Sequence, residues 1–208
     1  MTHLVLFYDD TLKRMTGAEG RPEDHALEEL KALHTLKNKL SIPTAEEVFA
    51  YFKDKPGVWI ELEMKMANAS LYPDDRVRLY CQKLLQAAKE ALPAGTHIFT
   101  SFDHRTLGIL KEIDSQVPKL FIYGKAPTDE LIPEALALGC QRVGIMMEHT
   151  TRAWVDAAHK AGLKVTGWPN RSLKGAALAA GIGVDGLATD IPSQLIGKEQ
   201  ENRNNGRR

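Results

Sequence analysis

Strand-like and helix-like segments alternate along the chain from residue 54 onward, and this alternation constrains the fold more than any other feature. Most of the strand-like runs are short and apolar, the run over residues 58–65 alternates apolar and charged residues, and most of the helical patterns end at a glycine or a proline. Six such units with short connections favour a parallel sheet covered by helices, the α/β class. The predicted strands are residues 58–65, 97–102, 119–124, 141–147, 163–168 and 184–190. The predicted helices are residues 74–91, 105–113, 128–138, 151–161 and 173–180, with a short last helix opened by Pro192 and Ser193.

The first fifty residues lack this regular alternation. Thr44 and Glu47 have the spacing of a capping box, in which each side chain accepts a hydrogen bond from the other residue's backbone. The expected elements are a strand over residues 4–8, a polar loop over 10–20, and helices over 26–33 and 45–52.

The domain organisation follows from what separates these segments. No internal stretch has the composition of a linker, so we expect a single domain over residues 1–197. Residues 198–208 carry no apolar anchor and predict a disordered polar tail.

Charge and hydropathy exclude several classes of function. The 27 Lys and Arg residues balance 27 Asp and Glu residues, so the chain offers no basic surface for nucleic acid or anionic lipid. No apolar run approaches the roughly 18 residues of a membrane span, and the start lacks the pattern of a signal peptide. Cys81 and Cys140 are lone cysteines, which we expect as buried thiols without a disulfide. These features predict a cytoplasmic protein.

Three signals resemble known chemistry but have a simpler explanation. The glycines at 181, 183 and 186 match a dinucleotide-binding pattern, but here a helix precedes them and a strand follows, so a helix C-cap is expected. Asp9 and Asp10 end a strand-like run, but they are adjacent, whereas a phosphatase nucleophile pair needs two aspartates with one residue between them. The seven histidines contain no metal-binding spacing, so no zinc site is predicted.

One group of charges does point to a site. Glu61, Glu63 and Lys65 alternate along a predicted strand, so their side chains share one face. Charges on a buried strand are costly unless the strand end is open to solvent or ligand, and β/α barrels place their active sites at such ends. A carboxylate beside an ammonium suits a divalent metal next to a phosphate. The alternative is an internal Glu–Lys ion pair inside the barrel.

Six segments, in the order in which they occur, resemble the glycerophosphodiester phosphodiesterase family. In that family, the first segment is a strand that ends in His-Asp and is followed by Thr-Leu-x-Arg-x-Thr. The next three segments are Ile-Pro-Thr-Leu-Glu-Glu, Glu-Ile-Lys and Ser-Phe-Asp. The last two are a strand that ends in Trp and the segment Asp-Gly-Ile-Ile-Thr-Asp-x-Pro. The matching segments are residues 4–16, Ile42-Pro43-Thr44 with Glu46-Glu47, Glu63-Met64-Lys65, Ser101-Phe102-Asp103, Val165 to Trp168, and Asp185 to Pro192.

The resemblance implies a fold and an activity. The fold is a TIM-type β/α barrel of the PLC-like phosphodiesterase kind, and the activity is hydrolysis of glycerophosphodiesters to glycerol 3-phosphate and an alcohol. It implies Glu63 as ligand of a weakly held divalent cation (Mg or Ca), Lys65 as a phosphate or substrate contact, and Trp168 as a wall beside the glycerol.

The sequence also departs from the family pattern. The family's two opening strands would lie before residue 4, so we expect an N-terminally truncated barrel of six β–α units plus one extra N-terminal strand. A second copy of the chain is a candidate to cover the open barrel edge.

Tyr8 stands where the family has a catalytic histidine. A tyrosine hydroxyl, whose ordinary pKa is near 10, can protonate a leaving alkoxide but is a poor base at neutral pH. Two hypotheses therefore stay open: a phosphodiesterase, and a catalytically inactive relative that binds a phosphodiester or a partner.

Overall fold

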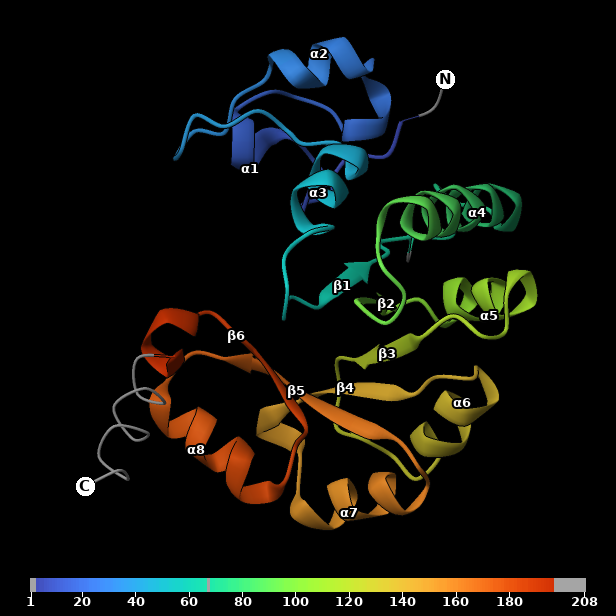
Figure 1. The fold of residues 1–208 in the computed structure, drawn as a ribbon, viewed down its shortest axis with the longest axis vertical. Helices are drawn as coiled ribbons and strands as arrows, with labels where there is room; N and C mark the ends of the chain where they lie inside the picture. The colour runs from blue at the N-terminus through green and yellow to red at the C-terminus, as the bar shows by residue number, and fades with distance from the viewer. Residues whose placement is uncertain (1–2, 67, 197–208) are drawn as a thin grey trace. The chain divides into compact units, whose positions relative to one another are not determined.

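The computed structural model describes residues 3–66 and 68–196 (Figure 1). The polar tail predicted at residues 198–208 lies outside the described residues. The chain divides into two compact units, one within residues 1–59 and 82–96 and the other within residues 60–81 and 97–208.

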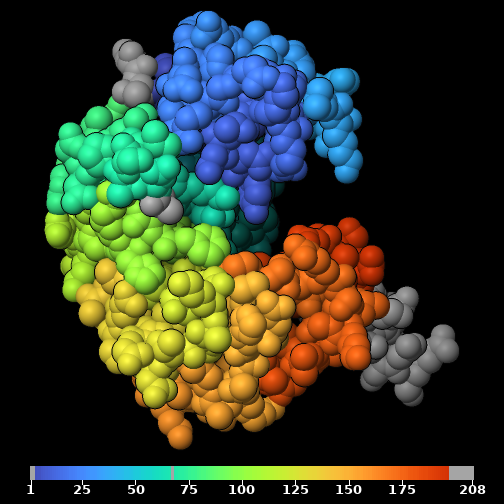
Figure 2. Space-filling view, turned by 180° about the vertical axis from the view of Figure 1, so that it is seen from behind, coloured from blue at the N-terminus to red at the C-terminus, as the bar shows by residue number. Residues whose placement is uncertain are grey.

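The second unit contains a six-stranded parallel sheet whose strands follow one another in chain order. This confirms the predicted α/β class and all six predicted strands. In the space-filling view, consecutive segments also lie next to one another, from the yellow atoms near residue 125 to the red atoms near residue 190 (Figure 2). The strands are β1 (Ile60–Glu63), β2 (His97–Ser101), β3 (Lys119–Tyr123), β4 (Arg142–Met146), β5 (Lys164–Asn170) and β6 (Gly186–Thr189).

The helices that connect these strands also follow the prediction, with one clear shift of boundary. The helix predicted over residues 128–138 begins at Leu131 and not at residue 128. An earlier start would place Pro133 in the helix interior, where its missing N–H breaks a hydrogen bond, whereas the first turn tolerates it. The helices are α4 (Asp74–Ala91), α5 (His104–Ile113), α6 (Leu131–Ala137), α7 (Arg152–Lys160) and α8 (Leu173–Ile182), with a 3₁₀ turn η2 (Met147–His149) and a helical segment at residues 192–196.

The glycines near the end of α8 have the expected structural role. Gly183 adopts a left-handed φ of 91° and its N–H bonds the carbonyls of Ala179 and Ala180, which ends the helix. Strand β6 then begins at Gly186, so the helix C-cap interpretation is confirmed and no phosphate-binding turn is formed.

The core of the second unit lies between the sheet and its helices. Phe99 and Phe121 are completely buried, and so are Leu107 and Leu110 from α5. Buried aromatic side chains of this size dominate the apolar area of a small core.

Both cysteines are free and buried, as predicted. Burial raises the pKa of the Cys81 thiol and of the Cys140 thiol to about 12. Two inert thiols therefore belong to the packing and not to a redox site.

The first unit corrects two predictions. Residues 4–8 do not form a strand: Val5 makes a single antiparallel bridge to Thr44. The backbone N–H of Leu6 bonds the Pro43 carbonyl, and proline has no N–H with which to return a second bond. The extra N-terminal strand expected for the barrel is therefore wrong. The expected polar loop contains the short helix α1 (Lys13–Thr16), which follows the completely buried Leu12.

The remaining elements of the first unit agree with the sequence. They are η1 (Pro22–Asp24), α2 (Leu27–Ala32) and α3 (Ala45–Phe52). The capping box of α3 is confirmed: the Glu47 N–H donates to Thr44 Oγ1 at 3.2 Å, and the Thr44 N–H donates to Glu47 Oε2 at 2.9 Å. Leu12, Leu30 and Ile42 form a small apolar core.

Asp185, in the segment that matches the family's Asp-Gly motif, stabilises the fold through two side-chain contacts. Its Oδ2 accepts the Val165 N–H at 2.7 Å and lies 2.8 Å from His159 Nε2. Burial opposes ionisation, but these two partners outweigh it and lower the pKa of the carboxyl. Because that pKa lies below the unfolded value near 3.9, the charge stabilises the fold above about pH 4 and the contribution is lost as pH falls.

Replacing Asp185 with asparagine keeps an acceptor for Val165 but removes the charge. We expect the free energy of unfolding at pH 7 to fall by about 1 kcal/mol, and the difference from wild type to be smaller at pH 3 than at pH 7. Urea unfolding at both pH values measures this, with Asp190→Asn as the control because Asp190 is 66% exposed. A difference of the same size at pH 3 and at pH 7 would contradict the charge-based explanation.

Candidate functional site

The charged face predicted at the first strand of the sheet is present. Leu62 and Met64 are buried, whereas the alternating residues Glu61, Glu63 and Lys65 are exposed on the other face. Lys65 Nζ lies 3.7 Å from Glu63 Oε1, and the two side chains are 37% and 32% exposed. A pair this accessible is not the internal ion pair of the alternative, because solvent or a ligand can reach both charges.

Glu61 lies on the same face, two residues before Glu63. Partial burial raises the pKa of its carboxyl, Arg142 on β4 opposes this rise, and the nearby charge of Glu63 adds to it. Arg142 lies on β4, which two strands of the sheet separate from β1.

The position of Trp168 shows that the sheet curls. Trp168 lies on β5, and its ring packs edge-to-face on Phe102, which directly follows β2, with ring centres 5.4 Å apart. The Trp168 Nε1 atom is buried and has no hydrogen-bond partner in the described part of the chain. Phe102 is 43% exposed, so the two rings form an apolar wall that a ligand can reach.

Two glycines leave room for this wall. A Cβ atom added at Gly144 would lie 3.6 Å from Trp168 Cδ1 and 3.2 Å from Leu120 Cδ2. A Cβ atom added at Gly124 would lie 3.6 Å from Phe102 Cε1. The space beside the rings is therefore produced by the absence of side chains on the neighbouring strands.

The structure assigns the predicted site residues to different units. Glu63, Lys65 and Trp168 belong to the sheet unit, each at or just beyond the carboxyl half of a strand. Tyr8 belongs to the first unit and is 68% exposed. Phe102 was not among the predicted site residues. The Ser-Phe-Asp segment was its only signal in the sequence, because its partner Trp168 lies three strands further along.

The residues present do not fit a complete divalent-cation site. Ca²⁺ takes about six to eight oxygen ligands, and Mg²⁺ demands near-octahedral oxygen geometry. Within residues 3–66 and 68–196, no three His, Cys, Asp or Glu side chains are grouped to hold a metal ion. The ammonium of Lys65 also lies beside Glu63, where a cation would have to bind. The metal-ligand role of Glu63 stays a prediction, and we assign no step to a metal ion.

The helices carry no membrane signal: none in the described ranges is both long and apolar enough to cross a bilayer.

Comparison with known proteins gives consistent results. The sequence pattern of the glycerophosphoryl diester phosphodiesterase family matches residues 2–194. A glycerophosphodiester phosphodiesterase of Caldanaerobacter subterraneus is 29% identical over 202 residues, which are 93% of this chain and 79% of the relative.

Solved structures have the same fold. An Oleispira antarctica phosphodiesterase in complex with the product sn-glycerol-3-phosphate superposes with a TM-score of 0.81 at 21% identity, covering 93% of this chain and 78% of the other. A glycerophosphodiester phosphodiesterase from Thermotoga maritima gives a TM-score of 0.71 at 20% identity, covering 94% and 79%. The predicted barrel-type fold is confirmed by these similarities.

Proposed function

Because the chain belongs to the glycerophosphoryl diester phosphodiesterase family, we propose that it hydrolyses glycerophosphodiesters to glycerol 3-phosphate and an alcohol. The observation that carries this proposal is the exposed pair of Glu63 and Lys65 at the end of β1. An ammonium at the carboxyl end of a barrel strand suits the single negative charge of a phosphodiester.

Hydrolysis needs three events at the phosphorus atom. A water oxygen attacks phosphorus and loses a proton to the solvent, the bond to the alcohol oxygen breaks, and the leaving alkoxide takes up a proton. In the proposal, Lys65 stabilises the charge that develops on the phosphoryl oxygens, and Glu63 holds the ammonium in place. Such preorganised charges commonly supply the largest single contribution to catalysis.

Tyr8 is proposed to donate the proton to the leaving alkoxide, as the residue at the family's histidine position. A tyrosine side chain is in general a weak catalyst of water activation compared with the histidine of the family, so this step gains little from position 8. We therefore expect slow turnover.

The aromatic pair is proposed to bind the carbon skeleton of the substrate. Trp168 and Phe102 offer an apolar, partly exposed surface, which suits the glycerol carbons and not the charged phosphate.

The test is release of glycerol 3-phosphate from glycerophosphocholine by the purified chain. We expect slow release that exceeds the release by Glu63→Gln. Lys164→Met serves as a control, because Lys164 is an exposed lysine at the amino end of β5. Equal release by wild type and Glu63→Gln would contradict the proposed role of Glu63, and release no faster than in the absence of protein would contradict the proposed activity.

Tyr8 also favours a second candidate, a protein that binds a phosphodiester without cleaving it. In that case glycerol 3-phosphate stays at the level of Glu63→Gln, but glycerophosphocholine changes the fluorescence of the protein. The change is expected to disappear in Trp168→Phe, which leaves the other two tryptophans in place. This outcome would replace the first proposal.

We further propose that a second copy of the chain covers the end strands of the sheet. Within the described sheet, β1 pairs with β2 alone and β6 pairs with β5 alone. An end strand presents unpaired backbone groups that favour association. Light scattering on the eluting protein should give twice the mass of one chain, and the mass of a single chain would contradict this.

A further inference from the structure

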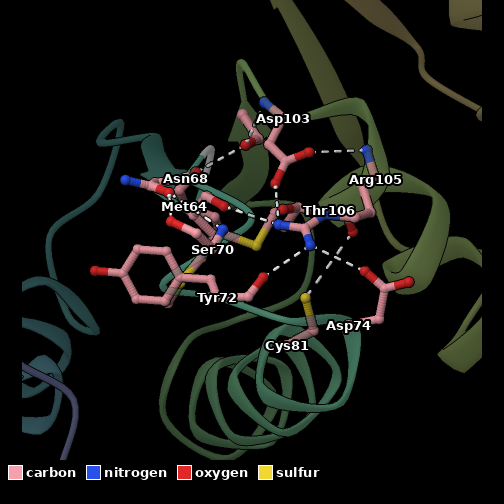
Figure 3. A network of polar contacts seen from close by, with 11 residues as sticks. Met64, Asn68, Ser70, Tyr72, Asp74, Cys81, Asp103, Arg105 and Thr106 are labelled. Atoms are coloured by element: carbon pink, nitrogen blue, oxygen red, sulfur yellow. Dashed lines mark hydrogen bonds and ion pairs between the residues drawn. The ribbon is translucent and has the colours of Figure 1, made fainter.

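Arg105, the second residue of α5, holds the segment that follows Lys65 at two points. Its Nη2 donates to the Met66 carbonyl at 3.0 Å. Its Nη1 donates to the Tyr72 carbonyl at 2.7 Å (Figure 3). One planar guanidinium therefore fixes two backbone carbonyls on the connection between β1 and α4, which a single ammonium cannot reproduce.

Two carboxylates fix the guanidinium in turn. Asp103 Oδ2 lies 3.1 Å from Nη2, and Asp74 Oδ1 lies 2.9 Å from Nη1. Asp103 is only 11% exposed and also accepts the Arg105 backbone N–H as the N-cap of α5. Because Asp103 is held by the helix start, the direction of the Arg105 side chain is set by the fold.

Lys65 lies between two anchored residues. On one side, Ser101 Oγ donates to the Met64 carbonyl at 2.7 Å, and the Met64 N–H donates to the Thr100 carbonyl at 2.8 Å. On the other side, Arg105 holds the Met66 carbonyl. Met64 is thus bonded to the end of β2 and Met66 to the start of α5. Lys65, between them, lies beyond the end of β1.

We propose that Arg105 is a positioning residue that holds the backbone of Lys65 so that its ammonium meets the phosphate group of the substrate. This inference rests on the proposed role of Lys65 in hydrolysis. A misplacement of about 1 Å in a catalytic group can cost a hundredfold in rate, so the anchoring of a residue on a connecting segment matters.

Limited proteolysis tests the anchoring without any assay of activity. In Arg105→Met, trypsin is expected to cleave the native protein after Lys65 about tenfold faster than in wild type, because the segment opens more often. Arg105→Lys should give an intermediate rate. The control is Arg78→Met, because Arg78 pairs with Glu112 and joins the same two helices without touching the segment. Unchanged cleavage after Lys65 in both Arg105 variants would overturn the proposal.

Kinetics test whether Arg105 acts through Lys65. Arg105→Met is expected to lower kcat/KM by about 10- to 100-fold, with Arg105→Lys in between. In a Lys65→Met background the same change should cost nothing further, because the residue it positions is gone. Effects that multiply in the double variant would show independent roles and overturn the inference.

The two tests separate the possible failures. If wild type releases no glycerol 3-phosphate but Arg105→Met exposes Lys65 to trypsin, the anchoring stands and the proposed function fails. If wild type is active and cleavage after Lys65 does not change, the function stands and the anchoring fails. The melting temperature of each variant shows whether the whole fold is lost. If Arg105→Met does not fold, the comparison of Arg105→Lys with wild type decides between these outcomes.

Discussion

Replacing Lys65 with methionine is expected to lower kcat for release of glycerol 3-phosphate by about 10²- to 10³-fold, because it removes the cation nearest to the proposed phosphate position. Methionine keeps most of the length of the side chain. Lys65 is only partly buried, so the fold should not be affected. Steady-state release at saturating glycerophosphocholine measures the effect on kcat.

The Lys65 prediction has two controls. Lys164→Met removes one positive charge at the other end of the sheet and should leave kcat unchanged. Lys65→Arg keeps the charge and should recover part of the activity. If Lys65→Met turned over as fast as Lys164→Met, the phosphate contact would have to be assigned to another residue.

Replacing Tyr8 with histidine is expected to raise kcat by about 10²- to 10⁴-fold, the usual contribution of a general acid–base group. An imidazole titrates near pH 6.5, so it can both accept a proton from water and donate one to the alkoxide. The rate of this variant should therefore acquire a dependence on pH in that range. Since Tyr8 is 68% exposed, the change removes no core packing.

Two further variants isolate the effect at Tyr8. Tyr51→His places a histidine at an equally exposed tyrosine of the same unit and should not change the rate. Tyr8→Phe removes the hydroxyl and should slow the reaction if Tyr8 donates a proton. A rate for Tyr8→His equal to that of wild type would exclude this position from the acid–base chemistry.

The sheet was predictable from sequence for a physical reason. A parallel strand buried on both faces is a nearly continuous apolar run, as most of these strands are, and each strand here is followed by a helical segment. The predicted strand at residues 4–8 was equally apolar but wrong, because strand formation also requires a partner. Its neighbour offers Pro43, which cannot extend the ladder.

The site was predictable only where it depends on local spacing. Glu63 and Lys65 share a face because they are two residues apart, and the structure confirms the placement. Phe102 could not be found in this way, because its contact with Trp168 requires the curl of the whole sheet. The anchoring of Lys65 by Arg105 likewise joins two connections that are far apart in sequence.

Gly124 and Gly144, the two glycines beside the rings of Trp168 and Phe102, differ in how easily each can be replaced by alanine. At Gly124 a methyl group would make ordinary contacts, 3.6 Å from Phe102 and 3.9 Å from Trp168, so alanine there would narrow the space at little cost to folding. At Gly144 the same methyl would lie 3.2 Å from Leu120, which would have to move. Selectivity at the proposed glycerol side of the site is therefore best altered at Gly124, where a substitution adds a methyl group and leaves both rings untouched.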